Sequence, residues 1–175
     1  LQYGGREKND DDAVFYIGYP LTELEEPLGK QKSSIVAELQ RVLSAKTIVT
    51  YIGSFGYSYE LELICEAAQI IEKRGLEDVH FVIAGDGQQY KTIEKRVSSL
   101  SNVSLVGWLS GPEIAGILRL SHIGLIPCRS PFGTITNKFF EYLSVGLPII
   151  SSLEGEMETI IAEHGIGYSY KPGDL

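Results

Sequence analysis

The segment from Thr136 to Gly146 contains the residue types and the spacing best suited to bind a charged small molecule. Thr136 is expected to cap a helix that begins at Asn137, so the first amide groups of this helix would point outward toward a phosphate. Lys138 adds a full positive charge at the same place. The alternative is a solvated lysine, which is the usual position of this residue type.

Glu141 follows Lys138 by about one helical turn. Because a carboxylate accepts hydrogen bonds with both oxygens, it suits a vicinal diol such as the 2′ and 3′ hydroxyls of a ribose. The competing interpretation is a surface glutamate that contacts only water.

A second candidate is the glycine-containing turn of Gly53, Ser54, Phe55 and Gly56, which separates an expected strand from an expected helix. Backbone amides and the positive end of the helix could face an anion there. The glycines have the spacing GxxG, so the turn matches neither the dinucleotide-binding fingerprint nor the P-loop. Glycines that serve only a tight turn are the alternative.

Two further turns follow expected strands. Trp108 and Leu109 could bind a base or another flat ring through their backbone amides, and a core tryptophan is an equally good interpretation. Asp86 lies between Gly85 and Gly87, and we expect it to cap the helix that follows.

These turns must be positioned by a scaffold of strands and helices. From Thr47 onward, apolar runs alternate with amphipathic stretches, which is typical of a parallel sheet with helices on both faces. Strands are expected at 47–52, 79–85, 103–107, 123–128 and 147–152, with a short one at 167–170. Helices are expected at 59–74, 88–100, 112–119, 137–145 and 156–163. Ligands of open α/β sheets bind at the carboxyl ends of the strands, where the candidate turns lie.

The chain is expected to form one Rossmann-like α/β domain over residues 46–175, since 175 residues with 43% hydrophobic content support a single sizeable core. Residues 1–45 read as a linker region with a short strand at Ala13–Tyr19 and a helix at Ser33–Leu43.

Composition narrows the possible partners. A formal net charge of −8 disfavours nucleic acid, and no apolar run approaches the roughly 20 residues that span a bilayer. Cys65 and Cys128 form no CxxC pair and have no histidine at metal-ligand spacing. We therefore expect core cysteines, no metal site and a reducing compartment.

The stretch NKFFEYLSVGLPIISS resembles the donor-site segment of family 4 retaining glycosyltransferases, which have the two-domain GT-B fold. Other segments are similar to this family in the same order, namely TIVTYIGSFG, FVIAGDG, VSLVGWLSGPEIAGIL, HIGLIPC and GEMETIIAEHGIGYSYKPGD. The resemblance covers about residues 46 to 175, and the ordered series is more specific than any single motif. It suggests the C-terminal, donor-binding half of such an enzyme.

The resemblance implies transfer of a sugar from a nucleotide diphosphate sugar, UDP- or GDP-linked, to an acceptor hydroxyl with retention and without a metal or other cofactor. Its implied site residues are Glu141 at the donor ribose, Asn137 and Lys138 by the phosphates or sugar, Gly53 to Gly56 around the diphosphate, and Trp108 and Leu109 at the base.

Two departures from the family pattern concern charge. Gly133 stands eight residues before Glu141, where the family commonly has a second glutamate. The resemblance therefore does not identify the sugar of the donor. Residues 53–66 contain no basic side chain to face the diphosphate, a role that Lys138 or Arg129 could fill.

The resemblance also implies a missing N-terminal acceptor domain, a cytoplasmic protein with peripheral membrane contact through that domain, and a role in polysaccharide assembly. The isolated donor-binding part would then turn over little or nothing. Two other classes stay open, a nucleotide-sugar 2-epimerase of similar architecture and a non-catalytic scaffold.

Overall fold

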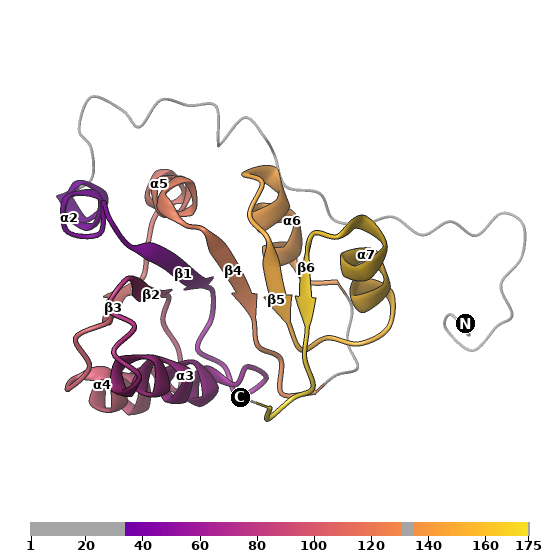
Figure 1. The fold of residues 1–175 in the computed structure, drawn as a ribbon, viewed down its shortest axis with the longest axis horizontal. Coiled ribbons are helices and arrows are strands. Elements are labelled where there is room, and N and C mark those ends of the chain that lie inside the picture. The colour runs from indigo at the N-terminus through magenta and orange to yellow at the C-terminus, as the bar shows by residue number, and fades with distance from the viewer. Residues whose placement is uncertain (1–33, 131–134, 175) are drawn as a thin grey trace, which may run out of the picture.

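A computed structural model of the chain describes residues 34–130 and 135–174. Its strands are β1 (Thr47–Ile52), β2 (Val79–Ala84), β3 (Val103–Gly107), β4 (Ile123–Ile126), β5 (Ile149–Ser151) and β6 (Gly167–Ser169). They form one six-stranded sheet in the order β3-β2-β1-β4-β5-β6 (Figure 1). Every neighbouring pair is parallel, which confirms the expected sheet.

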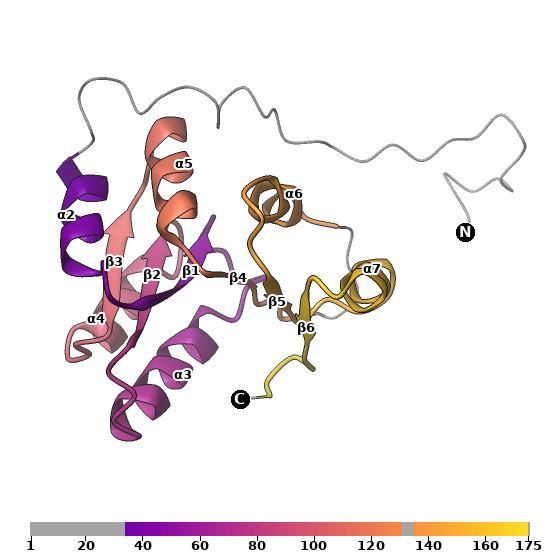
Figure 2. The same cartoon turned by 45° about the horizontal axis from the view of Figure 1, so that its top comes forward.

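The helices cover both faces of this sheet. They are α2 (Ser34–Val42), α3 (Leu61–Lys73), α4 (Tyr90–Val97), α5 (Gly111–Leu120), α6 (Asn137–Ser144) and α7 (Glu156–His164). Helices α2, α5, α6 and α7 lie on one side, and α3 and α4 lie under β1 to β3 on the other (Figures 1 and 2). The predicted Rossmann-like α/β fold is confirmed.

The ends of the elements differ from the expectation for identifiable reasons. Strand β4 stops at Ile126 because Pro127 has no N–H to continue the ladder, and Pro148 likewise delays β5 to Ile149. Helix α3 begins at Leu61, two residues after the expected start, because Tyr59 forms an isolated antiparallel bridge with Cys128.

Helix α2 falls in the stretch that the sequence assigned to a linker region. Its Val36 and Leu39, together with Leu43, are buried in the same cluster as residues of α5 and α6. The described part of this stretch therefore packs onto the domain. The strand expected at Ala13–Tyr19 lies outside the described residues.

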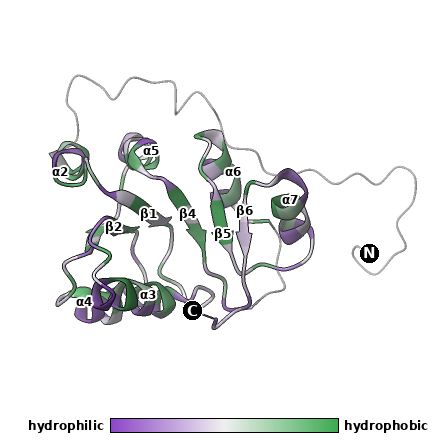
Figure 3. Ribbon diagram, viewed as in Figure 1, coloured by the Kyte–Doolittle hydropathy of each residue, from purple (hydrophilic) through white to green (hydrophobic). Residues whose placement is uncertain are grey.

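Apolar side chains lie on both faces of the sheet. Figure 3 shows β4 and β5 as hydrophobic along their length and the outer strand β6 as weakly hydrophilic. Central strands of a parallel sheet read as continuous apolar runs, whereas a short polar edge strand resists pairing with other chains.

Tyr142 fastens α6 to the sheet. Its fully buried hydroxyl accepts a hydrogen bond from the amide of Ile52 at 3.2 Å and donates one to the carbonyl of Leu125 at 3.2 Å. Burial raises the pKa of Tyr142 well above its usual range, so the phenol keeps the proton that it donates. Gly124 leaves room for the ring, because a methyl group there would overlap it.

None of the helices in residues 34–130 and 135–174 is long and apolar enough to cross a lipid bilayer.

Gly124→Ala should destabilise the domain because the added methyl group meets the ring of Tyr142, which the surrounding core holds in place. Overpacking of this kind costs about 1 to 3 kcal/mol, and urea denaturation would measure the loss. Gly56→Ala is the matched control, because its new methyl group comes no closer than 3.8 Å to its neighbours. Equal unfolding midpoints for the two variants would contradict this account of the α6 contact.

Candidate functional site

The strand order reverses direction at β1, which has β2 on one side and β4 on the other. Ligands of open α/β sheets bind where the order reverses, at the carboxyl ends of the strands. The loop after β1 and the loop after β4 meet there. The amide of Glu60 donates to the carbonyl of Pro127 at 2.8 Å, and the amide of Arg129 donates to the carbonyl of Ser58 at 2.9 Å.

The glycine-containing turn after β1 is held from several sides. The hydroxyl of Tyr51 donates to the carbonyl of Ser54 at 2.7 Å, and the amide of Phe55 donates to the carbonyl of Asp86 at 2.8 Å. Burial raises the pKa of Tyr51 far above its usual range, so this phenol remains a donor. The ring of Phe55 is fully buried and stacks on Tyr90 at 5.7 Å between centroids. The ring and the amide of Phe55 are therefore both used within the protein, and this residue shapes the turn.

Lys138 is buried, with only 8% of its surface exposed, so the alternative of a solvated lysine is wrong. Its Nζ donates to the hydroxyl of Tyr59 at 2.9 Å. The same atom lies 4.0 Å from the centroid of the Tyr59 ring and 5.4 Å from that of Tyr51. Gly53 lies against the end of this side chain, because a methyl group at Gly53 would overlap it. The structure thus brings together two predicted site residues that are far apart in sequence.

The buried ammonium group of Lys138 has unused binding capacity. An ammonium group has three donors, and the described residues supply one hydrogen-bond acceptor, the oxygen of Tyr59. The ion pairs within residues 34–130 and 135–174 join Arg96 and Arg129 to glutamates and do not include Lys138. Two aromatic rings compensate the charge in part. A buried charge without an ionic partner is costly, so an anion at this position would be stabilised.

The start of α6 lies beside this ammonium group. Thr136 is the N-cap residue, as predicted, but its hydroxyl makes no capping hydrogen bond and its Oγ1 is buried without a partner among the described residues. The first amides of a helix lack the usual intrahelical acceptor, and in α6 the amide of Phe139 donates to the carbonyl of Thr136 at 3.0 Å. Asn137 is exposed at the first position, and Glu141 is half-buried four residues later, on the same face of the helix.

A cavity of about 320 Å³ lies at the carboxyl ends of β1, β2 and β3. Four predicted site residues line it, namely Gly53, Ser54, Trp108 and Leu109, together with Ile52, Ala84, Gly85, Asp86 and Ile114. Trp108 is 76% exposed, so the interpretation of a core tryptophan is wrong. Leu109 is buried. Lys138, Glu141, Thr136 and Asn137 do not line this cavity, and Gly53 connects it with Lys138.

Asp86, in the turn after β2, does not have the helix-capping role expected from the sequence. The carboxylate of Asp86 accepts a hydrogen bond from the adjacent amide of Gly87 at 2.7 Å. The N-cap position of helix α4 is Gln89, whose side chain makes no capping hydrogen bond. The expectation that Asp86 caps this helix is therefore wrong.

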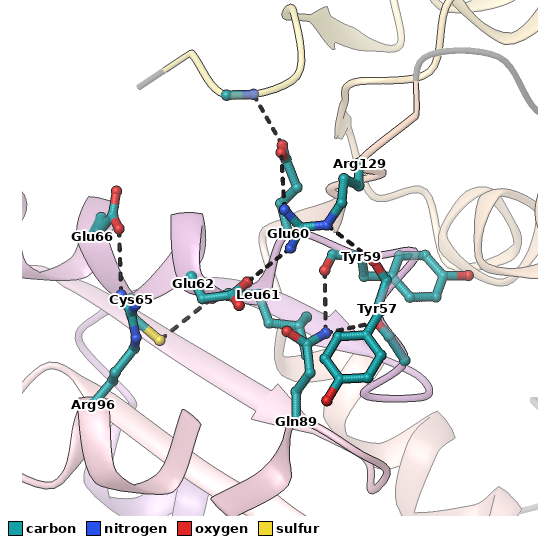
Figure 4. Close-up of polar contacts among 12 residues, drawn as sticks. Tyr57, Tyr59, Glu60, Leu61, Glu62, Cys65, Glu66, Gln89, Arg96 and Arg129 are labelled. Carbon is teal, nitrogen blue, oxygen red and sulfur yellow. Dashed lines mark hydrogen bonds and ion pairs between the residues drawn. The ribbon is translucent and has the colours of Figure 1, made fainter. Parts of the chain in front are cut away.

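Arg129 already forms hydrogen bonds and ion pairs within the protein (Figure 4). Its guanidinium donates to the carboxylate of Glu62 at 3.3 Å and to the carbonyl of Tyr57 at 3.0 Å, and it lies 4.0 Å from Glu60. It thereby joins the loop after β4 to the loop before α3. Of the two cations that could face a diphosphate, Lys138 is the better candidate. Gly133 lies outside the described residues.

A larger hollow of about 1020 Å³ lies on the open face of the sheet beside α3. Its lining includes Val49, Phe81, Ile123, Leu125 and Ile150, and none of the predicted site residues. Its position on the face of the sheet and its apolar walls do not suit a phosphate, so the candidate site is the smaller cavity with the neighbouring start of α6.

The cysteines are core residues, as predicted. Both are free thiols and both are buried. Burial raises the pKa of Cys65 to about 11 and also raises the pKa of Cys128, so neither is a reactive thiolate at neutral pH. In the part of the chain that the structure describes, no group of three or more His, Cys, Asp or Glu side chains could hold a metal ion.

Sequence reasoning missed three residues of the site, Tyr51, Tyr59 and Gln89. The two tyrosines enclose the ammonium group of Lys138, and Gln89 donates to the loop that carries Tyr59. No local motif marks them, because these contacts join residues that are 30 to 87 positions apart in the sequence.

Comparisons with known proteins bear on the family and the fold of this chain. Residues 46–175 match the family of glycosyl transferases group 1. The chain is 28% identical over 116 residues to an uncharacterized glycosyltransferase of Methanocaldococcus jannaschii, covering 65% of this chain and 30% of the relative. It is 31% identical over 90 residues to the alpha-D-kanosaminyltransferase of Streptomyces kanamyceticus, covering 50% of this chain and 23% of the relative. The chain thus spans less than a third of the length of either relative.

Among solved structures, the fold is similar to that of HepE from Anabaena, whose crystal structure contains UDP. The TM-score is 0.69 at 17% identity, over 93% of this chain and 44% of that one. Because the family match extends over well more than half of the sequence, the chain belongs to the glycosyl transferases group 1 family.

Proposed function

We propose that this chain is the donor-binding domain of a retaining glycosyltransferase with GT-B architecture, which binds a nucleoside diphosphate sugar at the carboxyl edge of its sheet. The observation that carries the proposal is the ammonium group of Lys138, buried at the start of α6 without an ion-pair partner among the described residues. The UDP in the HepE crystal structure and the kanosaminyl transfer named for the Streptomyces relative agree with it.

In this proposal the donor lies along the carboxyl edge of the sheet. The base enters the cavity beside Trp108 and Leu109, and Glu141 binds the ribose hydroxyls. The diphosphate lies between Gly53 and the first turn of α6, since Gly53 lines the cavity and also contacts Lys138. The helix N-terminus and the ammonium group then attract the same phosphate oxygens.

The proposed chemistry is electrostatic. Negative charge grows on the diphosphate as its bond to the sugar breaks, and fixed donors aimed at that charge stabilise the transition state. The two ammonium protons that Tyr59 does not accept are available for this role. One such contact contributes on the order of 3 kcal/mol to lowering the barrier. The acceptor hydroxyl would be positioned by a second domain.

A donor screen tests this function most directly. Calorimetric titration of the chain with UDP, GDP, ADP and CDP should give saturable binding with at least one of them, and absence of binding to all four would overturn the proposal. With the full-length protein, sugar transfer that requires an acceptor is expected. Conversion of the donor without an acceptor would indicate an epimerase, and folded protein with neither activity would indicate a scaffold.

Lys138→Met should weaken binding of the preferred nucleoside diphosphate by about tenfold or more, because hydrogen bonds to charged groups contribute about 1.5 to 3 kcal/mol. Titration calorimetry measures the change in Kd. Lys95→Met, at an exposed position of α4, should leave the Kd unchanged. Equal affinities for the two variants would place the diphosphate away from α6.

Glu141→Ala should weaken the same nucleotide by about tenfold, since a charged acceptor for the ribose hydroxyls is lost. The corresponding 2′,3′-dideoxy nucleotide separates the ribose contact from other effects, because wild type and variant should bind it alike. Glu163→Ala, at an exposed position of α7, is the control. A penalty that is the same for the dideoxy nucleotide would show that Glu141 does not contact the ribose.

A further inference from the structure

Gln89 is a polar residue buried beneath the glycine-containing turn, with only 2% of its surface exposed (Figure 4). Its side-chain Nε2 donates to the carbonyl of Gly56 at 2.7 Å and to the carbonyl of Tyr59 at 3.3 Å. Its backbone amide donates to the carbonyl of Phe55 at 3.0 Å. One residue at the start of α4 therefore holds three carbonyls of the loop between β1 and α3.

The loop also has contacts on its other side, where Arg129 donates to the carbonyls of Tyr57 and Ser58 and Tyr59 forms a bridge with Cys128. Tyr57 and Ser58 are exposed, and Tyr57 is among the most exposed large side chains of the described residues. Loops of this kind move easily unless hydrogen bonds tie them to a rigid element. Gln89 supplies such bonds from a helix that packs under the sheet.

Tyr59, near the end of this loop, is the residue that contacts Lys138. The carbonyl of Tyr59 accepts from Gln89, and its hydroxyl accepts from Nζ of Lys138 at 2.9 Å. Displacement of the Tyr59 backbone would move the ring that lies 4.0 Å from this ammonium group. Gln89 and Lys138 are thus coupled through Tyr59.

We infer that Gln89 is a positioning residue, which fixes Tyr59 and through it aims the ammonium group of Lys138 at the donor diphosphate. That the ligand is a diphosphate rests on the proposed function. The coupling between Gln89 and Lys138 rests only on their contacts with Tyr59. An apolar side chain would fill the same buried space, and the Oε1 of Gln89 has no hydrogen-bond partner among the described residues. A buried amide with an unpaired oxygen is destabilising, so core packing alone does not account for it.

Asn102 provides a matched control. It is also a buried amide, its Nδ2 donates to the carbonyl of Ala68 at 2.9 Å, and its Oδ1 also lacks a partner among the described residues. It precedes β3, at the opposite end of the sheet from Lys138. Loss of this amide disturbs the fold in a similar way without touching the loop that carries Tyr59.

The test follows the side chain of Lys138 by NMR in protein labelled with ¹³C-lysine, with the signal assigned by its loss in Lys138→Met. In the wild type, the aromatic ring 4.0 Å from Nζ should displace the ε-methylene signal from those of exposed lysines. Gln89→Met, which fills the space but cannot donate, should remove most of this displacement, and Asn102→Leu should preserve it. Gln89→Asn is one methylene too short to reach both carbonyls and should have the same effect as Gln89→Met. It replaces Gln89→Met in the test if that variant does not fold.

A displaced Lys138 signal that persists in folded Gln89→Met or Gln89→Asn would overturn the coupling. Calorimetry then tests its consequence for the donor, with Gln89→Met expected to weaken nucleoside diphosphate binding about as much as Lys138→Met. Unweakened binding would overturn the positioning role. If the wild type binds no nucleotide, the proposed function fails, and the NMR result still decides whether Gln89 positions Lys138.

Discussion

A positive charge buried at the start of a helix is the feature on which the carboxyl edge of this domain depends. Lys138 cannot be solvated by bulk water at 8% exposure, so its surroundings must compensate the charge. Tyr59 supplies a hydrogen bond and a ring face, Tyr51 supplies a second ring, and Gly53 supplies the space. This partial compensation leaves the site suited to a mobile anion rather than to a permanent protein partner.

The scaffold meets this requirement by bringing distant segments together at the point where the strand order reverses. Tyr142 and Gly124 fasten α6 to β1 and β4, so the helix start lies beside the turn that follows β1. Pairing between residues 58–60 and 127–129 joins the two loops. Gln89 supports the first of these loops from the other side. The helix, two loops and a buried amide therefore hold one side chain.

Backbone and side chains contribute differently to the candidate site. Glycines and strand ends supply space, while a few charged or aromatic side chains surround the candidate site. Phe55 illustrates the difference, because its ring belongs to the core while its amide helps to shape the turn. Trp108 is the reverse case, a large ring left exposed beside an apolar cavity. Neither role follows from residue type.

The sequence by itself determined the parallel α/β fold and the approximate positions of its strands and helices, because hydrophobic periodicity and turn residues are local properties of the chain. It also pointed to the carboxyl edge of the sheet as the candidate site. It could also mark Lys138 and Gly53 as candidates from their positions after a strand and at a helix start. Only the tertiary structure decided that Lys138 is buried, that Trp108 is exposed, and that Tyr59 contacts both Lys138 and Gln89. Burial and pairing arise from contacts between segments dozens of residues apart, and no pattern within a single segment encodes them.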